Sequence, residues 1–426
     1  MTLHQSLNKS AYLKKIVLNA HPIIQHTIER LKIPDIIRSY ISSDQRCIVQ
    51  TEQALSIVIH NYLTESLPLY EFKDWVRPLA AQAIGLSEPE RDSIQDDRIG
   101  KALEQFYLGR HKDVFFRLAL RAIKLFELDC SQVHQDTTSI TFCGKYAGWS
   151  AQELLGFGHN KDHRPDLKQL VLGLTVTADG AVPLCHRIYD GNQTDDRLHP
   201  DNHKTLQKLL GRTDFIYVAD SKLATEDNLS TICQWGGLFV SIMPRTWKED
   251  EWFREKVRRG EIKWQHILSR TNPRKPDSQV DRYYKASGDH CTSQGYQLYW
   301  IRSTQKVEQD RETRARRLQA ALQGLRALQT KLNKYRLKNR DNIDAAIQKI
   351  LKEHHCRDLI DVEIDECCEF KPLRKKRGRP KKEEMNTELL QGKTLYSISF
   401  GVCHDVIKRE EKGDGIFPLI TRFALY

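Results

Sequence analysis

A change in hydrophobic periodicity near Asp129 constrains the fold of this chain more than any other feature of the sequence. Before Asp129, apolar residues recur at helical spacing, as at Leu55 and Ile59, which indicates amphipathic helices. After it, residues 168–177 are apolar at alternate positions, which is typical of a half-buried strand. The sequence therefore predicts a helical N-terminal domain over residues 1–128, followed by a domain that is built around a sheet.

The elements after Asp129 follow the order β-β-β-α-β-α-β. A turn at Ala178-Asp179-Gly180 links the second and third strands, and Thr225 caps the second helix. Three antiparallel strands followed by alternating helices and strands match an RNase H-like arrangement. The sequence therefore predicts an α/β core over residues 129–245, with strands over residues 133–142, 168–177, 182–188, 215–220 and 238–243.

Two aspartates stand out in this core. Asp136 lies among β-branched and small polar residues of the first strand, and Asp220 lies at the C-terminal end of the apolar strand 215–220. In open α/β sheets, chemistry collects outside the carboxyl ends of the strands. Two such carboxylates could share divalent metal ions, one as a bridging ligand and one as a second ligand, for phosphodiester chemistry. The alternative is that each is an ordinary turn or surface acid.

Composition favours a polyanionic partner and a reducing compartment. The chain of 426 residues has 67 basic and 56 acidic residues, a net charge of +11. Its 10 cysteines form no CxxC pair, which predicts reduced thiols, and His354-His355-Cys356 is interpreted as a helix end rather than a metal site. No signal peptide and no membrane-spanning run is present, so we expect a cytoplasmic protein that makes no contact with a membrane.

The function of the helical domain stays open at this point. It could contain a helix-turn-helix that reads DNA, or it could be a module for packing or dimerisation. No recognition helix can be assigned from the sequence.

The chain after Pro244 predicts a large α+β insertion over residues 246–392. Residues 254–263 are charged and expected at the surface, and residues 296–301 form a strand. The long basic stretch 307–352 is helical, either as a coiled coil or as a helical hairpin that packs on its own domain. Residues 393–426 are expected to return to the core as strands.

A basic segment lies inside this insertion. Gly378 and Pro380 hold it extended, and its arginines could enter the narrow minor groove of A·T-rich DNA, as in an AT-hook. The alternative is a solvated basic linker. The residues predicted to contact DNA are Arg374, Lys375, Lys376, Arg377, Gly378, Arg379, Pro380, Lys381 and Lys382.

Three motifs make the chain resemble the DDE transposases of bacterial insertion sequences. They are Gln135-Asp136-Thr137-Thr138-Ser139, Tyr189-Asp190-Gly191-Asn192-Gln193-Thr194-Asp195 and Val218-Ala219-Asp220-Ser221. The resemblance implies an RNase H-like catalytic core, Mg²⁺ or Mn²⁺ as cofactor, and cleavage and strand transfer at terminal inverted repeats. It also implies double-stranded DNA as partner, both repeat and target, and a homo-oligomer. Asp136 and Asp220 match the first and second catalytic aspartates; Asn192 and Asp195 match a motif without an assigned role.

The resemblance also implies a catalytic glutamate on a helix after the strand 416–421. The sequence ends shortly after that strand, so no third acid is assigned and we expect a truncated, inactive transposase. Glu410 and Glu411 precede the turn at residues 413–415 and are interpreted as exposed hairpin acids. Two alternatives stay open: a DNA-binding or inhibitory transposase fragment without activity, and a metal-dependent nuclease unrelated to transposition.

Overall fold

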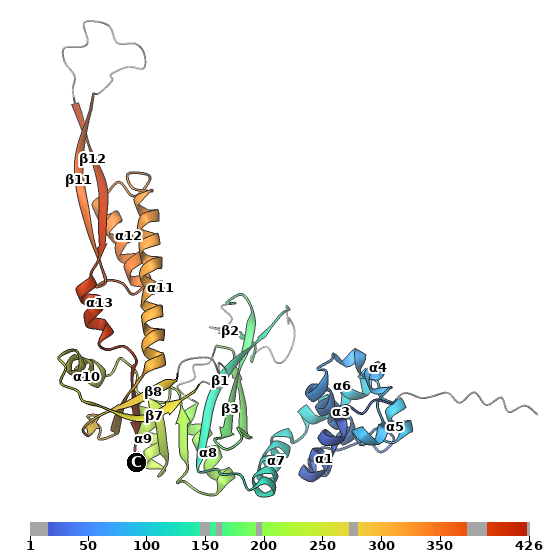
Figure 1. Ribbon diagram of the computed structural model, residues 1–426. Helices are drawn as coiled ribbons and strands as arrows, with labels where there is room; N and C mark the ends of the chain where they lie inside the picture. Colours follow the sequence, from blue (N-terminus) through green and yellow to red (C-terminus); the bar gives the residue numbers. More distant parts are fainter. Residues whose placement is uncertain are drawn as a thin grey trace, which may run out of the picture. The chain divides into compact units, whose positions relative to one another are not determined.

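The computed structural model describes residues 16–144, 154–158, 164–192, 198–271, 280–372 and 390–423 (Figure 1). Its residues form a mixed α/β structure that divides into two compact units, Met1–Val240 and Ser241–Tyr426. No helix in the described ranges combines the length and apolar character needed to cross a membrane.

The first unit begins with helices, as the periodicity predicts. Pro34 and Pro89 lie in the first turns of their helices, where a missing N–H costs no hydrogen bond. Buried aliphatic side chains, including Ile57 and Ile99, pack into one core. The helices are α1 (His21–Leu31), α2 (Ile33–Tyr40), α3 (Thr51–Thr64), α4 (Phe72–Val76), α5 (Glu88–Asp92), α6 (Asp96–Leu108) and α7 (His111–Phe126), with 3₁₀ turns η1 (Leu69–Glu71) and η2 (Ala81–Ile84).

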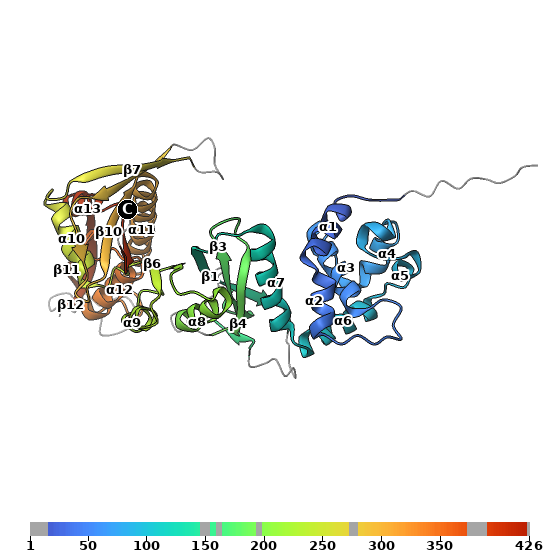
Figure 2. The same ribbon diagram turned by 90° about the horizontal axis from the view of Figure 1, so that it is seen from below.

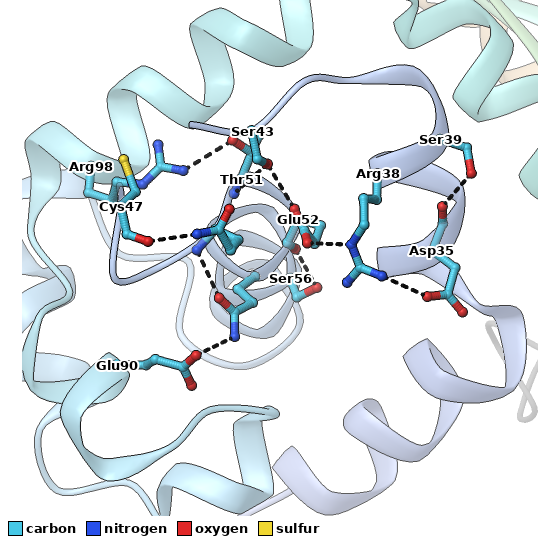
Figure 3. Close-up of polar contacts among 12 residues, drawn as sticks. Asp35, Arg38, Ser39, Ser43, Cys47, Thr51, Glu52, Ser56, Glu90 and Arg98 are labelled. Carbon is cyan, nitrogen blue, oxygen red and sulfur yellow. Dashed lines mark hydrogen bonds and ion pairs between the residues drawn. The ribbon is translucent and has the colours of Figure 1, made fainter. Parts of the chain in front are cut away.

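A polar network fixes the beginning of α3 (Figure 3). The buried Glu52 carboxylate accepts hydrogen bonds from Arg38 Nε (2.8 Å) and Ser43 Oγ (3.0 Å). Gln50 and Gln53 form a capping box, which satisfies backbone N–H groups that the first turn leaves unpaired. The hydrogen bonds of these side chains are therefore made to other residues of the helical part.

The α/β part of the first unit has the predicted element order, with one additional two-residue strand, β2. The strands are β1 (Gln132–Phe142), β2 (Gly156–Phe157), β3 (Lys168–Thr177), β4 (Pro183–Asp190), β5 (Ile216–Ala219) and β6 (Leu238–Ile242), and the helices are α8 (His199–Leu210) and α9 (Glu226–Gln234). Neighbouring strands follow the order β4-β3-β1-β5-β6, and β2 also pairs with β3. Strands β1, β3 and β4 are antiparallel, whereas β5 is parallel to both β1 and β6. The predicted cap is present, because Thr225 Oγ1 accepts a hydrogen bond from Asn228 N.

Helices α7 and α8 pack against opposite faces of β4 (Figure 2). The ring of Phe115 on α7 lies 4.4 Å from that of His186, centroid to centroid. The Tyr189 hydroxyl donates to Asn202 Oδ1 on α8 at 3.1 Å. His186 and Tyr189 are an odd number of residues apart on one strand, so their side chains point to opposite faces.

The second unit combines an antiparallel sheet with a helical hairpin and a long ribbon. The sheet strands are β7 (Trp264–Arg270), β8 (Asp281–Ala286), β9 (His290–Cys291), β10 (Gln297–Ser303) and β13 (Ile416–Thr421). Their order is β13-β10-β8-β7, with β9 beside β10. The remaining elements are α10 (Lys248–Arg258), α11 (Thr304–Gln329), α12 (Arg340–Glu353), β11 (Ile360–Pro372), β12 (Leu390–Val402) and α13 (His404–Glu411).

Helices α11 and α12 form the helical hairpin, one of the two predicted alternatives. Leu325 and Leu328 of α11 are buried with Ile343 and Ile347 of α12 in one apolar cluster. The same cluster includes Ile398 of the ribbon. The leucine stripe is therefore covered within its own chain rather than by a coiled-coil partner.

Three sequence expectations for the second unit are wrong. Arg254, expected at the surface, is buried in α10, where its Nε donates to Asp250 Oδ2 at 2.7 Å. Residues 394–402, expected in the core sheet, pair along their length with β11. Alternation predicts a strand but does not identify its partner. Glu410 and Glu411 belong to helix α13, not to a hairpin.

Candidate active site

Asp136 is exposed near the middle of β1. Its backbone pairs with Leu174 of the antiparallel strand β3. The preceding residue, Gln135, pairs with Ala219 at the end of the parallel strand β5. One Asp136 carboxylate oxygen, Oδ1, accepts a hydrogen bond from the backbone N–H of Thr137 at 2.8 Å.

Asp220 is also exposed and follows Ala219 directly. Its Oδ1 accepts a hydrogen bond from the backbone N–H of Lys222 at 3.1 Å, and its carbonyl oxygen accepts one from Leu223 N at 3.1 Å. Both aspartates therefore come one residue after a pair of residues that face each other across parallel strands. Adjacent strands lie roughly 4.8 Å apart. The structure thus brings the two predicted acids together.

The two aspartates line a common open pocket of about 370 Å³. His134 pairs with Val218 in the parallel register, and each lies two residues before an aspartate. Alternation of side chains therefore puts all four residues on one face of the sheet. The pocket is lined by His134, Gln135, Asp136, Leu174, Val176, Val218, Ala219 and Asp220.

Gln135 supports this pocket from the buried face of β1. It is 5% exposed, its Oε1 accepts a hydrogen bond from Thr175 Oγ1, and its Nε2 donates to the carbonyl oxygen of Asp136 at 3.2 Å. Sequence reasoning named Gln135 only as part of a motif and did not single out His134. The period of two along β1 could have placed His134 beside Asp136.

Burial keeps several groups around this sheet neutral. It raises the pKa of Tyr217, on β5, well above the ordinary value, and the Tyr217 hydroxyl lies 3.2 Å from His199 Nδ1. Burial also lowers the pKa of His186 beside α7, and the nearby His111 and Lys112 lower it further. Asp136 and Asp220 are the two carboxylates that line the pocket.

The donor set of the pocket suits a hard divalent cation. Carboxylate oxygens are the ligands that Mg²⁺ prefers, and Mg²⁺ commonly binds one or two carboxylates together with waters and substrate phosphates. Asp136 and Asp220 supply such a pair. Across the ranges that the structure describes, no group of three or more His, Cys, Asp or Glu side chains is placed to hold a metal ion.

The other candidate residues lie elsewhere in the chain. In the second unit, Glu411 Oε1 lies 3.6 Å from Arg314 Nη2, whereas Asn192 lies just after β4. Asp195 and the basic segment Arg374–Lys382 lie outside the described residues. His354 follows the last residue of α12, as expected for a helix end, and all ten cysteines are free thiols.

Comparison with known proteins gives limited matches. Residues 13–120, which include most of the N-terminal helices, match the model of a domain of unknown function, DUF4277. No curated protein matches the chain significantly. Among solved structures, the chain is similar to the piggyBac transposase in a cryo-EM synaptic complex with hairpin DNA. That match has a TM-score of 0.35 and 10% sequence identity, and it covers 68% of this chain and 62% of the other.

Proposed function

We propose that this chain is a DNA transposase of the DDE type, related to those of bacterial insertion sequences. The reaction would be metal-dependent cleavage of a phosphodiester bond and strand transfer at terminal inverted repeats. The observation that carries the proposal is the position of Asp136 and Asp220 after paired residues of β1 and β5. The strand order β4-β3-β1-β5-β6, with the first three strands antiparallel, supports the proposal of an RNase H-like core.

Asp136 and Asp220 would hold Mg²⁺ or Mn²⁺ together with oxygens of the DNA phosphate. The bound metal would supply activation of the attacking oxygen and stabilisation of the leaving oxygen. Other groups of the protein orient the two aspartates that would bind the metal. Gln135 holds the backbone of Asp136 in place, and the N–H groups of Thr137 and Lys222 orient one oxygen of each carboxylate.

We further propose that the chain alone cleaves DNA weakly or not at all. Chemistry with two metal ions normally uses a third carboxylate, and the pocket beside β1 and β5 is lined by only two in the described residues. Two carboxylates carry too little charge to hold both ions tightly.

Double-stranded DNA is the proposed partner, and the basic segment Arg374–Lys382 is proposed to contact its minor groove. We propose residues 1–128 as a domain for DNA-end binding or dimerisation, residues 129–245 as the catalytic core and residues 246–392 as an insertion. The protein would act as a homo-oligomer in the cytoplasm. A second candidate function is DNA binding without catalysis, which would inhibit an intact transposase; the two-carboxylate pocket favours it.

The test is cleavage of a labelled duplex that carries the element's own terminal repeat, with Mn²⁺ present. Asp136→Ala and Asp220→Ala are compared with Asp214→Ala, which removes an exposed carboxylate elsewhere in the same unit. Binding of the repeat without cutting supports the non-catalytic function. If the natural chain cuts the duplex and only Asp136→Ala and Asp220→Ala abolish the cutting, the transposase chemistry is supported. That result refutes the proposal that the chain alone cleaves DNA weakly or not at all. Absence of both binding and cutting refutes both functions.

A further inference from the structure

A second pocket, of about 360 Å³, lies within the second unit and is called the aromatic pocket here. It is lined by Trp264, Tyr284, Arg302, Thr304, Val307 and Glu308. The pairing of neighbouring strands places the residues of its floor side by side. Tyr284 pairs with Arg302 of β10 on one side and with His266 of β7 on the other. Trp264 lies two residues before His266, so Trp264, Tyr284 and Arg302 share one face of the sheet.

Helix α11 forms the wall of the aromatic pocket and packs against β8 and β10 (Figure 1). Thr304, Val307 and Glu308 are spaced by three and four residues, so they lie on one side of its first turns. Ser303 caps the N-terminus of the helix, because its Oγ accepts a hydrogen bond from Lys306 N at 3.2 Å. The wall of the pocket is therefore part of a well-anchored element.

The polar groups of the aromatic pocket are arranged for a ligand. In the ranges that the structure describes, the half-buried Arg302 guanidinium makes no hydrogen bond and no ion pair. Glu308 stands at the rim, where Arg311 Nη1 donates to its carboxylate at 3.0 Å. Trp264 is oriented by an edge contact with Phe253, with ring centroids 6.3 Å apart. The pocket thus combines two aromatic rings, an unpaired cation and a held carboxylate.

We propose that the aromatic pocket binds a single unpaired guanine base. Aromatic side chains stack on nucleobases, and a pocket of this volume matches a small planar ligand. Guanine presents two acceptors, N7 and O6, which suit the guanidinium of Arg302. Its opposite edge carries N–H donors, including N2–H₂, which suit the Glu308 carboxylate. The base could belong to a DNA strand or to a free nucleotide, because both present this chemistry.

This inference stands apart from the proposed function, since it uses neither Asp136 nor Asp220. It is tested with the full chain in EDTA, by fluorescence anisotropy of a short labelled oligothymidine strand with one central guanine. The guanine strand should bind roughly five- to a hundredfold more tightly than the same strand with a central abasic site. Equal binding of the two strands would overturn the proposal. The Asp136→Ala/Asp220→Ala variant should retain the preference, so failure of the transposase proposal leaves this result intact.

Matched substitutions locate the binding. Trp264→Ala and Arg302→Met should remove most of the preference for guanine, and Trp264→Phe should keep part of it because a ring remains. The controls are Trp252→Ala and Arg316→Met, which change an exposed aromatic on α10 and an exposed arginine on α11. A preference that survives both pocket substitutions, or falls equally in the controls, contradicts the assignment. Circular dichroism confirms that each variant is folded.

Single-atom changes in the base test the two polar contacts. Replacing guanine by 7-deazaguanine removes N7 and should weaken binding to the natural chain but not to Arg302→Met. Replacing it by hypoxanthine removes the N2 amine and should weaken binding less in Glu308→Gln than in the natural chain. If the base changes act equally on natural and substituted chains, the contacts are not those proposed.

Competition distinguishes the two sources of the base. Free dGMP that displaces the strand, when dAMP does not, assigns the pocket to a nucleotide. Displacement only by guanine-containing strands assigns it to an unpaired base in DNA. Displacement by both nucleotides equally would overturn the preference for guanine.

Discussion

At the residue scale, Asp136 depends on a residue on the buried face of its own strand. Gln135 touches no ligand, yet it accepts a hydrogen bond from Thr175 and donates one to the Asp136 carbonyl. Residues that orient ligands in this way are positioning residues. Their replacement commonly costs roughly 10–100-fold in metal affinity.

Gln135→Leu should therefore weaken binding of Mn²⁺ by roughly 10–100-fold. It should also lower the free energy of unfolding by about 1–3 kcal/mol, because Thr175 loses its acceptor in a buried position. Manganese titration followed by electron paramagnetic resonance measures the affinity, and urea unfolding measures the stability. Gln234→Leu, which replaces an exposed glutamine on α9 of the same unit, is the control. Unchanged manganese affinity in Gln135→Leu would count against a metal at this pair.

A buried histidine pair makes the helical part sensitive to acid. His21 Nδ1 lies 3.1 Å from His60 Nδ1, and both rings are fully buried. Burial, together with the charge of a protonated His21, lowers the pKa of His60 from 6.5 to about 4. Because the folded pKa lies below the unfolded one, protons favour unfolding. The contribution of His60 to stability is complete above pH 6.5 and is lost as the pH falls toward 4.

His60→Gln should remove this acid sensitivity while keeping a hydrogen-bonding side chain. In the natural chain, lowering the pH from 7 to 4 should reduce the free energy of unfolding by about 3 kcal/mol through His60. Urea unfolding at several pH values measures the loss. The exposed His26→Gln is the matched control and should keep the full loss. The same pH dependence in His60→Gln would refute the assignment.

At the element scale, α11 is held by a buried ion pair at its middle. Arg314 donates to both carboxylate oxygens of Asp414, at 2.9 and 2.6 Å, and the side chains are 10% and 8% exposed. Asp310 on the same helix accepts a hydrogen bond from Gly415 N at 2.9 Å. These contacts tie α11 to the turn that precedes β13.

Arg314→Met should lower the free energy of unfolding of the second unit by about 3–5 kcal/mol, because it leaves the Asp414 carboxylate buried and unpaired. The double substitution Arg314→Met/Asp414→Leu should recover much of that loss, since neither charge then remains. Urea unfolding provides the measurement. Arg316→Met, two residues along the same helix but exposed, should change little. A double variant as unstable as the single one would contradict this account.

At the scale of the whole molecule, the proposed DNA contacts come from separate parts of the chain. The strands β11 and β12 pair from Ile360 with Val402 to Pro372 with Leu390, and the basic segment connects them. Arg377 and Arg379 flank Gly378 in that segment. Arginines that enter a narrow minor groove should give a preference for A·T tracts as well as dependence on salt.

The substitution of both Arg377 and Arg379 by alanine should abolish the preference for A·T-rich over G·C-rich duplexes. The substitution of Lys381 and Lys382 by alanine removes the same charge and should keep that preference. In both variants the logarithm of affinity should fall less steeply with the logarithm of salt concentration, by about one for each phosphate that is no longer neutralised. Anisotropy titrations at several salt concentrations measure both effects. Equal weakening of the preference in the two variants would mean that the segment acts through charge alone.

Periodicity along the sequence was sufficient to predict the local elements of the first unit. The spacing of apolar residues predicts the helices before residue 129 and the strand 168–177, and the capping preference of threonine predicts the cap at Thr225. The structure confirms all three. The pairing of β12 with β11, the burial of Arg254 and the helix that carries Glu410 were missed. Arg254 is buried because it also donates to the carbonyl oxygens of Gly413 and Ile416, which are far away in the chain and which no local pattern reveals.

The sequence by itself determined that two aspartates lie at or after strands of an α/β core. Only the tertiary structure decided that they are neighbours. Gln135 pairs with Ala219 in the parallel register, so the residues that follow them lie side by side, Asp136 within β1 and Asp220 directly after β5. The same holds for the aromatic pocket, where Trp264, Tyr284 and Arg302 meet on three adjacent strands. These residues are far apart in the sequence, and the hydrogen bonds between the strands bring their side chains onto one face of the sheet.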